Sequence, residues 1–196
     1  MIITVTGRKG GVGKTTTAVH LACYLQKLAP TLLVDGDPNR SVTGWHKRGG
    51  LPVKVVDLMA APRHSRDYEH LVIDTAGGPS SEDLEALADG CDRLVLPTSP
   101  DAMSLDAMLQ TVEQLQGFRC DRFKILLTMV HPKPVTAADQ AREALAGLPL
   151  FQHNVRRFIA YEKAALLGVP VYGVKGDRNA RIAWHDYERI GQELLA

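Results

Sequence analysis

The feature that most constrains the fold is the amino-terminal stretch of this 196-residue chain. An apolar run at 1–6 leads into a glycine-rich segment, Gly7–Thr17, and then into Ala18–Leu28, where small or apolar residues recur at helical spacing. Glycines at a strand-to-helix turn let backbone N–H groups point inward, and together with the positive end of the helix they form an anion site. Lys14 can reach terminal phosphates, and the Thr15 hydroxyl is placed to bind Mg²⁺. The stretch is predicted to be a nucleotide-binding P-loop.

Two residues of this loop differ from the usual motif. The pattern G-x-x-x-x-G-K-[ST] ending at Thr15 requires glycine at position 8, where the chain has Arg8. A second lysine, Lys9, lies inside the loop. Most surface lysines are only solvated, but a cation within a phosphate-binding loop is expected to act on phosphate. We therefore predict a functional role for Lys9.

Length and composition limit the remaining possibilities. A chain of 196 residues with 45% hydrophobic content predicts one domain covering 1–196. The net charge is +1, so binding to nucleic acid or membrane would need a local patch. Cys23, Cys91 and Cys120 form no C-x-x-C pair, which favours reduced thiols. With neither a signal peptide nor a membrane-spanning apolar stretch in the sequence, a cytoplasmic location is expected.

Apolar runs alternate with helical patterns along the whole chain. The runs lie at 31–35, 53–57, 70–74, 94–96 and 123–130, and the helical patterns around 81–88, 103–116, 137–146 and 179–195. The run at 94–96 is expected to stop at Pro97. This alternation predicts an α/β fold of the P-loop NTPase type, a mostly parallel twisted sheet with helices on both faces. Thr6, Asp35 and Asp74 end three of these runs, so the chemistry is expected at the carboxyl edge of the sheet.

Acidic residues follow two of the apolar runs. Asp35 and Asp37, separated by one glycine, could position an attacking water and help to hold Mg²⁺. Asp, Gly and Pro also make ordinary turns, but the nearby P-loop favours the functional interpretation. Asp74 fits the Walker B role of holding Mg²⁺, with a helix-capping aspartate as the alternative. Gly77 and Gly78 would let backbone N–H groups approach a γ-phosphate.

Taken in order, these motifs resemble the deviant Walker ATPases of the ParA/MinD group. The resemblance rests on Lys9–Thr16, Asp35–Pro38 and Val72–Thr75. It continues through 97–100, 127–129 and 156–161 into the closing helix, so it covers essentially the whole chain. The small size, without an amino-terminal helix-turn-helix extension, is similar to the short ParA proteins of the ParF kind.

The resemblance implies a role for each motif residue. Lys14 would contact the β- and γ-phosphates, Lys9 would cross a dimer interface to the partner's nucleotide, and Asp37 would orient the attacking water. Mg²⁺ would be bound by Thr15, with Asp35 and the Walker B acid Asp74 beside it. ATP or ADP would be held by the remaining residues of the loop, Gly10, Gly11, Val12, Gly13 and Thr16, the last at the α-phosphate.

Base recognition is less well marked in the sequence. Thr128 stands where an asparagine of the family often contacts the base, so it is the expected base-side residue. The segment Thr128–His131 lacks the lysine and the acid of a guanine-binding motif, so ATP is preferred over GTP. Many family members have Asp-Thr-Pro-Pro where this chain has Asp74–Gly77, so the switch segment is expected to behave differently.

The resemblance implies a weak, Mg²⁺-dependent ATPase that acts as a switch. ATP would drive homodimerisation and non-specific binding to nucleoid DNA, and a small ParB-like or cargo-adaptor protein would stimulate hydrolysis. Such cycles partition plasmids or chromosomes, or position large cargoes such as carboxysomes. The candidate DNA-contacting residues are the basic ones near the carboxyl end, Arg156, Arg157, Lys163, Lys175, Arg178, Arg181 and Arg189.

Three alternatives share the loop. A metabolic enzyme of the dethiobiotin synthetase kind would need a committed substrate pocket, and its loop would not carry Lys9. A MinD-like membrane-associated ATPase would need a terminal basic amphipathic helix, whereas Tyr187–Ala196 is short and acidic at its tip, so no membrane partner is expected. Nitrogenase iron protein holds a cluster on cysteines, but Cys91 and Cys120 lack the glycine-rich setting that this requires.

Overall fold

The computed structural model describes residues 1–131 and 136–196. Within them one parallel sheet has the strand order β3-β2-β4-β1-β5-β6. The strands are β1 (Ile2–Gly7), β2 (Thr31–Gly36), β3 (Lys54–Asp57), β4 (His70–Gly77), β5 (Arg93–Thr98) and β6 (Phe123–Leu127). The helices are α1 (Lys14–Leu25), α2 (Ser41–Gly49), α3 (Ala61–His64), α4 (Ser81–Asp89), α5 (Ala102–Gly117), α6 (Thr136–Ala144), α7 (Ile159–Leu167) and α8 (Arg178–Leu195).

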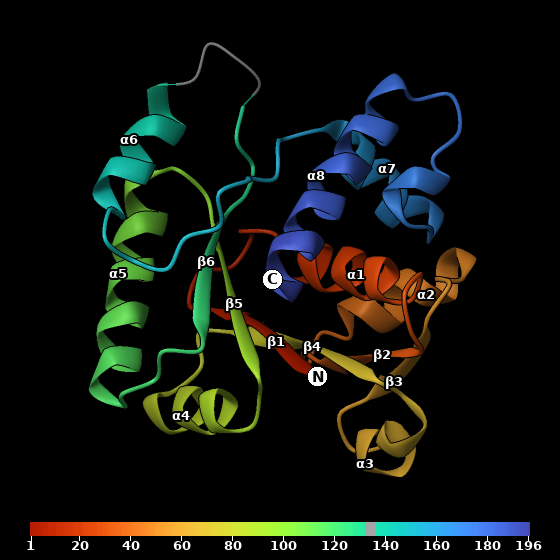
Figure 1. Cartoon of the computed structure of the whole chain (residues 1–196). Helices are drawn as coiled ribbons and strands as arrows, with labels where there is room; N and C mark the ends of the chain where they lie inside the picture. Colours follow the sequence, from red (N-terminus) through yellow and green to blue (C-terminus); the bar gives the residue numbers. More distant parts are fainter. Residues whose placement is uncertain (132–135) are drawn as a thin grey trace.

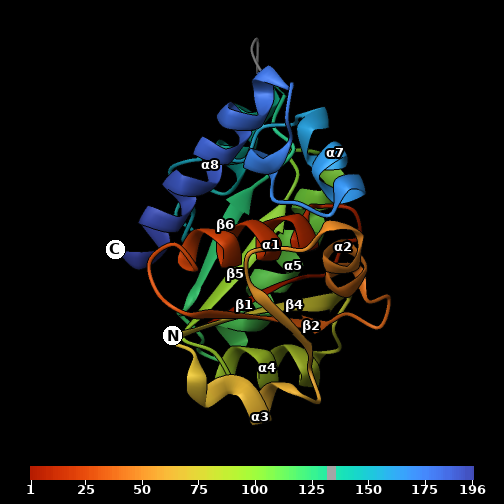
Figure 2. The same cartoon turned by 90° about the vertical axis from the view of Figure 1, so that its right-hand side faces the viewer.

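Helices cover both faces of the sheet (Figures 1 and 2). Leu33 of β2 packs into the core beneath α1, α7 and α8, whereas its neighbours Leu32 and Val34 face the opposite layer with Ala61 of α3. A second core on that side joins α4, α5 and α6 to β5 and β6. Because both faces are buried, the strands read as continuous apolar runs, and the predicted α/β class with a parallel sheet is confirmed.

Parallel strands bring their carboxyl ends to one edge. β1 lies between β4 and β5, and β2 lies beyond β4, so the loop after Gly7 is flanked by the ends of β2, β4 and β5. Asp35 and Asp74 lie directly opposite each other in the β2–β4 register. The expected gathering of these strand ends is therefore found.

Several boundaries differ from the sequence prediction; β4, for example, continues past Asp74 to Gly77. The first helix begins at Lys14 and ends at Leu25, which leaves Leu28 58% exposed instead of on the buried face. The sixth strand ends at Leu127, not at 130. No helix in the described part of the chain is long and apolar enough to cross a membrane.

A further difference is that β5 continues through Pro97 to Thr98. The N–H of Leu94 donates to Arg122 on the β6 side, so by alternation the nitrogen of Pro97 faces β1. The pairing of β5 with β1 ends at Val5–Val95. The missing N–H therefore falls just beyond the hydrogen-bonded part of the β1–β5 pair, and the proline is tolerated.

Candidate nucleotide site

The loop between β1 and α1 forms one wall of an open hollow of about 580 Å³. Gly11 and Gly13 have φ values of 77° and 85°, in the left-handed region that a side chain would strain. The turn places the first N–H groups of α1 toward the hollow, an arrangement suited to an anion. The lining residues are Arg8, Gly10, Gly11, Gly13, Lys14, Thr15, Thr16, Asp37, Asn39, Ser41, Gly77 and Met129.

Lys14 is the buried cation of this hollow, with 8% of its surface exposed. Its Nζ donates a hydrogen bond of 2.9 Å to the carbonyl oxygen of Lys9. Burial lowers the pKa of Lys14, and the charges of Asp74 and Asp37 oppose this shift. A cation held by one carbonyl near two carboxylates can exchange that carbonyl for a phosphate oxygen.

Two buried carboxylates, Asp35 and Asp74, lie opposite each other in the β2–β4 register, and each keeps one oxygen without a hydrogen-bond partner. Asp74 accepts from the Thr15 hydroxyl at 2.7 Å through Oδ2, and its Oδ1 has no partner. Asp35 accepts from the N–H and the hydroxyl of Thr43 at 2.8 and 2.6 Å through Oδ2, and its Oδ1 is likewise unpartnered. Unpaired buried oxygens are costly. Carboxylate and hydroxyl oxygens are the ligands that Mg²⁺ prefers, directly or through water, so this donor set fits that ion.

The electrostatics of Asp74 agree with a cation site. Burial raises the pKa of Asp74 to about 7, the hydrogen bond from Thr15 opposes this, and the neighbouring charges of Asp35 and Asp37 add to the rise. A bound divalent ion would reverse this shift, because it stabilises the ionised carboxylate.

Asp37 lies at the rim of the hollow and remains accessible. Its Oδ1 accepts from the N–H of Asn39 at 2.8 Å, which fixes the carboxylate in an Asx turn. Asp37 and Asn39 both line the hollow. A carboxylate held this way, above the buried pair, can orient a water molecule.

Lys9 is turned out of its own hollow. Although Arg8 and Gly10 line the hollow, Lys9 does not. Its Nζ lies 2.9 Å from Asp101 Oδ1 and 2.8 Å from Ser104 Oγ, on the first turn of α5. The hydroxyls of Ser104 and Ser99, with Lys9, hold the pKa of Asp101 well below its usual range. The two lysines of the loop thus point to different places.

A second pocket of about 250 Å³ adjoins the hollow and shares Gly13, Thr16 and Met129 with it. Its other lining residues are Thr128, Val155, Arg156, Arg157, Phe158, Tyr161, Glu162, Ala165 and Tyr187. The pocket is predominantly apolar and aromatic, which suits a nucleotide base next to a phosphate site.

Residues 3–171 match the CobQ/CobB/MinD/ParA nucleotide binding domain. The chain belongs to this family. It is 36% identical over 202 residues to maintenance of carboxysome distribution protein A from Gloeobacter kilaueensis, covering 98% of this chain and 93% of the relative. It is 26% identical over 240 residues to chromosome-partitioning ATPase Soj from Thermus thermophilus, covering 99% and 95%.

The fold agrees with the family. The septum site-determining protein MinD from Pyrococcus horikoshii, solved with Mg-ADP, superposes with a TM-score of 0.73 at 16% identity, over 100% of this chain and 97% of that one. At this identity the likeness concerns the fold alone. The predicted ParA/MinD resemblance and P-loop architecture are confirmed.

In this MinD/ParA family member, most of the residues expected from the sequence share one site. Gly10, Gly11, Gly13, Lys14, Thr15, Thr16 and Asp37 line the hollow, and Asp74 is buried close to Lys14 with Asp35 opposite it in the sheet. Val12 is buried, and its carbonyl lies 2.8 Å from the hydroxyl of Thr128. That hydroxyl is also 3.1 Å from the carbonyl of Thr98. Thr128 borders the second pocket, with its hydroxyl engaged by the main chain.

Several contacts of the site lie outside the expected motifs. Sequence reasoning did not find Thr43, which holds Asp35, or Asp101 and Ser104, which hold Lys9. Asp101 is the N-cap of α5 and accepts from the N–H of Ser104. An aspartate shortly before a polar residue and an apolar helix predicts such a cap. It does not predict that Lys9, 92 positions away in the sequence, binds the same aspartate.

Proposed function

We propose that this protein is a Mg²⁺-dependent ATPase switch that dimerises when it binds ATP. The observation that carries the proposal is the position of Lys9, inside the phosphate loop by sequence but turned out of its own hollow. A cation of the phosphate loop that is held by Asp101 and Ser104, with 34% of its side chain exposed, is available to the nucleotide of a second copy. ATP would then lie between two chains, and hydrolysis would loosen them.

Each residue of the hollow would have a separate role in ATP hydrolysis. Lys14 would hold the β- and γ-phosphates, Thr16 the α-phosphate, and Asp37 the attacking water. Thr15, Asp35 and Asp74 would hold Mg²⁺, which when bound neutralises charge on the phosphates. The apolar second pocket would take the base, with Thr128 at its border.

The cellular role that we propose is positioning of a large cargo over the nucleoid. The Gloeobacter relative is named for carboxysome distribution and the Thermus relative for chromosome partitioning. Both names describe the placement of large bodies, so the switch would act by cycling on and off DNA. A small ParB-like or adaptor protein would stimulate hydrolysis.

The carboxyl-terminal region offers a surface for DNA. Arg156 is paired with Asp186, and Lys163 with Asp177, so these two cations are neutralised. The five other basic residues of the predicted set are exposed and, within the described residues, have no ion pair: Arg157, Lys175, Arg178, Arg181 and Arg189. Four of the acids in this region are engaged internally, namely Asp177, Asp186, Glu188 and Glu193. The remaining charges of this region are those five basic residues and the exposed Glu162, an excess of positive charge, although the whole chain is almost neutral.

Gel filtration and DNA retention with ATP, with ADP and without nucleotide test the switch. We expect dimerisation and DNA retention only with ATP and Mg²⁺, and retention that falls steeply with salt because phosphate contacts release counterions. Chelation of Mg²⁺ should abolish both. If ATP promotes neither dimerisation nor DNA retention, the switch is excluded and the metabolic-enzyme alternative is favoured.

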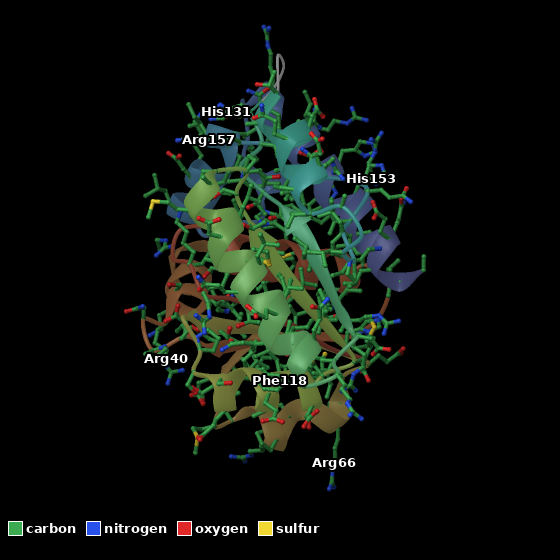
Figure 3. All side chains as sticks on the ribbon, turned by 90° about the vertical axis from the view of Figure 1, so that its left-hand side faces the viewer. Arg40, Arg66, Phe118, His131, His153 and Arg157 are labelled. Carbon is green, nitrogen blue, oxygen red and sulfur yellow. The ribbon has the colours of Figure 1, made fainter. Side chains whose placement is uncertain are left out.

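A matched pair of variants tests the DNA surface. Arg181→Ala with Arg189→Ala should weaken DNA binding by about tenfold or more and flatten its salt dependence, because each dimer loses four cations. Arg63→Ala with Arg66→Ala removes the same charge from exposed residues in the α3 region, and Arg66 lies far from Arg157 in Figure 3. This control should bind as the wild type does, and equal losses in both pairs would contradict the assignment.

A further inference from the structure

Arg40 occupies a position that suits it poorly by every local criterion. Its φ and ψ are 54° and 40°, in the left-handed region that costs a residue with a Cβ free energy and that glycine adopts easily. It is the N-cap of α2, where Ser, Thr, Asp or Asn is preferred, and its side chain makes no capping hydrogen bond. It also adds a positive charge at the positive end of a helix.

No local contact compensates for an arginine at this N-cap position. Asp35 accepts from the N–H of Thr43 and so caps α2 in place of Arg40. Among the described residues, the guanidinium of Arg40 has no hydrogen bond or ion pair, and the residue is exposed. Strained residues that local structure does not require are found at functional sites.

Another arginine of the chain shows that the strain at Arg40 needs its own explanation. Arg119 has a similar φ of 57°. It follows the end of α5, its N–H donates to Gln116, and the next N–H, that of Cys120, donates to Leu115. A left-handed residue is ordinary at a helix carboxyl end. At the start of a helix a left-handed residue is unusual, because the N-cap there usually has extended geometry.

The position of Arg40 indicates where its charge could act. It follows Asp37 by three residues, and its N–H donates to the Asp37 carbonyl at 2.9 Å, so the two belong to one turn. Asn39 and Ser41, on either side, line the phosphate hollow, but Arg40 does not. In Figure 3 its side chain lies at the edge of the molecule and is directed outward. The guanidinium is therefore on the nucleotide face of the chain but turned away from its own nucleotide site.

We propose that Arg40 is a second cation that acts across the dimer, contacting the ATP phosphates bound by the opposing copy. This inference rests on the proposed function, since it requires the ATP-bound dimer. Arginine suits the task because its planar guanidinium can hold two phosphate oxygens at once. Direct attachment to the Asp37 turn would link closure of the dimer to the residue that orients water.

The test uses Arg40→Gly, which removes the charge and relieves the backbone. The melting temperature should stay the same or rise by roughly 2 °C. The affinity of dilute monomer for ATP and ADP should stay within about twofold, whereas ATP-dependent dimerisation and ATPase activity should each fall by about tenfold or more, the effect of losing one charge-assisted contact. Arg40→Lys should restore part of the dimerisation and part of the ATPase activity. Arg119→Gly relieves similar strain away from the site and should leave dimerisation and activity unchanged.

Each other outcome has a distinct meaning. If dilute Arg40→Gly binds ATP more weakly, Arg40 acts on its own nucleotide and the assignment across the dimer is overturned. If the variant dimerises and hydrolyses ATP as the wild type does, Arg40 has no such role. If the wild type itself does not dimerise with ATP, the proposed function fails, independently of Arg40.

Discussion

At the scale of single residues, the two lysines of the phosphate loop, Lys9 and Lys14, lie in different surroundings. Lys14 is buried and faces Asp74 and Asp37, whereas Lys9 has 34% of its side chain exposed and rests on Asp101. An exposed ion pair of this kind contributes little stability. The contact can therefore hold Lys9 in the monomer without preventing its transfer to another anion.

Replacing Lys9 shows whether it acts on the nucleotide of a second copy or on its own nucleotide. Lys9→Ala should abolish ATP hydrolysis and ATP-dependent dimerisation but leave monomer affinity for ADP within about twofold, because the side chain lies outside its own hollow. Binding is measured by titration with a fluorescent ADP analogue and hydrolysis by phosphate release. Lys54→Ala, which removes an exposed lysine from edge strand β3, should change neither quantity. Loss of ADP binding in Lys9→Ala would show instead that Lys9 serves its own nucleotide.

At the scale of elements, α1 is the helix that connects the phosphate loop to the rest of the fold. It begins at Lys14 and packs against α8 where Gly191 meets Tyr24. A Cβ added at Gly191 would lie 2.2 Å from the Tyr24 ring, so any larger residue must displace that ring or separate the two helices. The glycine is required by this close approach, despite its cost within a helix.

Gly191→Ala should lower the free energy of unfolding by about 1–3 kcal/mol, the usual result of overpacking. Gly117→Ala is the matched control, since Gly117 also lies in a helix but has no atom within 4 Å of an added Cβ. It should be neutral or stabilising by up to about 1 kcal/mol. Urea denaturation of both variants measures the difference, and equal midpoints would mean that the Tyr24 ring or the two helices can shift at no cost.

The elements also show what the sequence could predict. All six strands of the described sheet coincide with predicted apolar runs, because most of them are buried on both faces. Helices α2, α3 and α7 were not predicted. In α7 the buried residues include Ala160 and Ala164, whereas Ile159 and Leu166 are 67% and 75% exposed, so the large apolar side chains do not mark the inner face. Helix α2 is short and contains Thr43 and Gly44, both poor helix formers.

Within the site, the local motifs were predictable and the long-range contacts were not. Glycines, lysines and strand-end acids lie in contiguous segments whose spacing determines their geometry. The contacts of Lys9 with Asp101 and of Arg8 with Gln114 join residues 92 and 106 positions apart. The strain at Arg40 depends on a dihedral angle that its residue type disfavours, so no propensity rule would have indicated it.

At the scale of the whole molecule, His20 joins the layer of helices that supports the site. It lies one turn after the phosphate loop and is fully buried. Its Nδ1 donates to the Thr16 carbonyl at 2.7 Å, while its Nε2 accepts from the N–H of Val171 at 3.0 Å. The ring stacks on Tyr187 of α8 and meets Tyr161 of α7 edge-on. These contacts require a neutral imidazole.

Burial lowers the pKa of His20 to about 4, from an unfolded value near 6.5. The unfolded chain therefore takes up a proton at this residue before the folded chain does. Its contribution is complete above pH 6.5 and is lost as the pH falls toward 4, by up to about 3 kcal/mol. The raised pKa of Asp74 has the opposite sign, because its contribution is greatest in acid and is lost as the pH rises through about 7.

The two effects overlap between pH 4 and 6.5, so Asp74→Asn is the appropriate background for measuring His20. In Mg²⁺-free buffer, urea unfolding of Asp74→Asn should show stability that falls steadily from pH 6.5 to 4.5. Asp74→Asn with His20→Gln should be less stable at pH 7.5, through lost packing, but should have a clearly shallower acid dependence. Parallel pH profiles would mean that His20 can be protonated in the folded protein without cost. A shallower profile would locate the acid sensitivity at the junction of α1, α7 and α8, directly behind the phosphate loop.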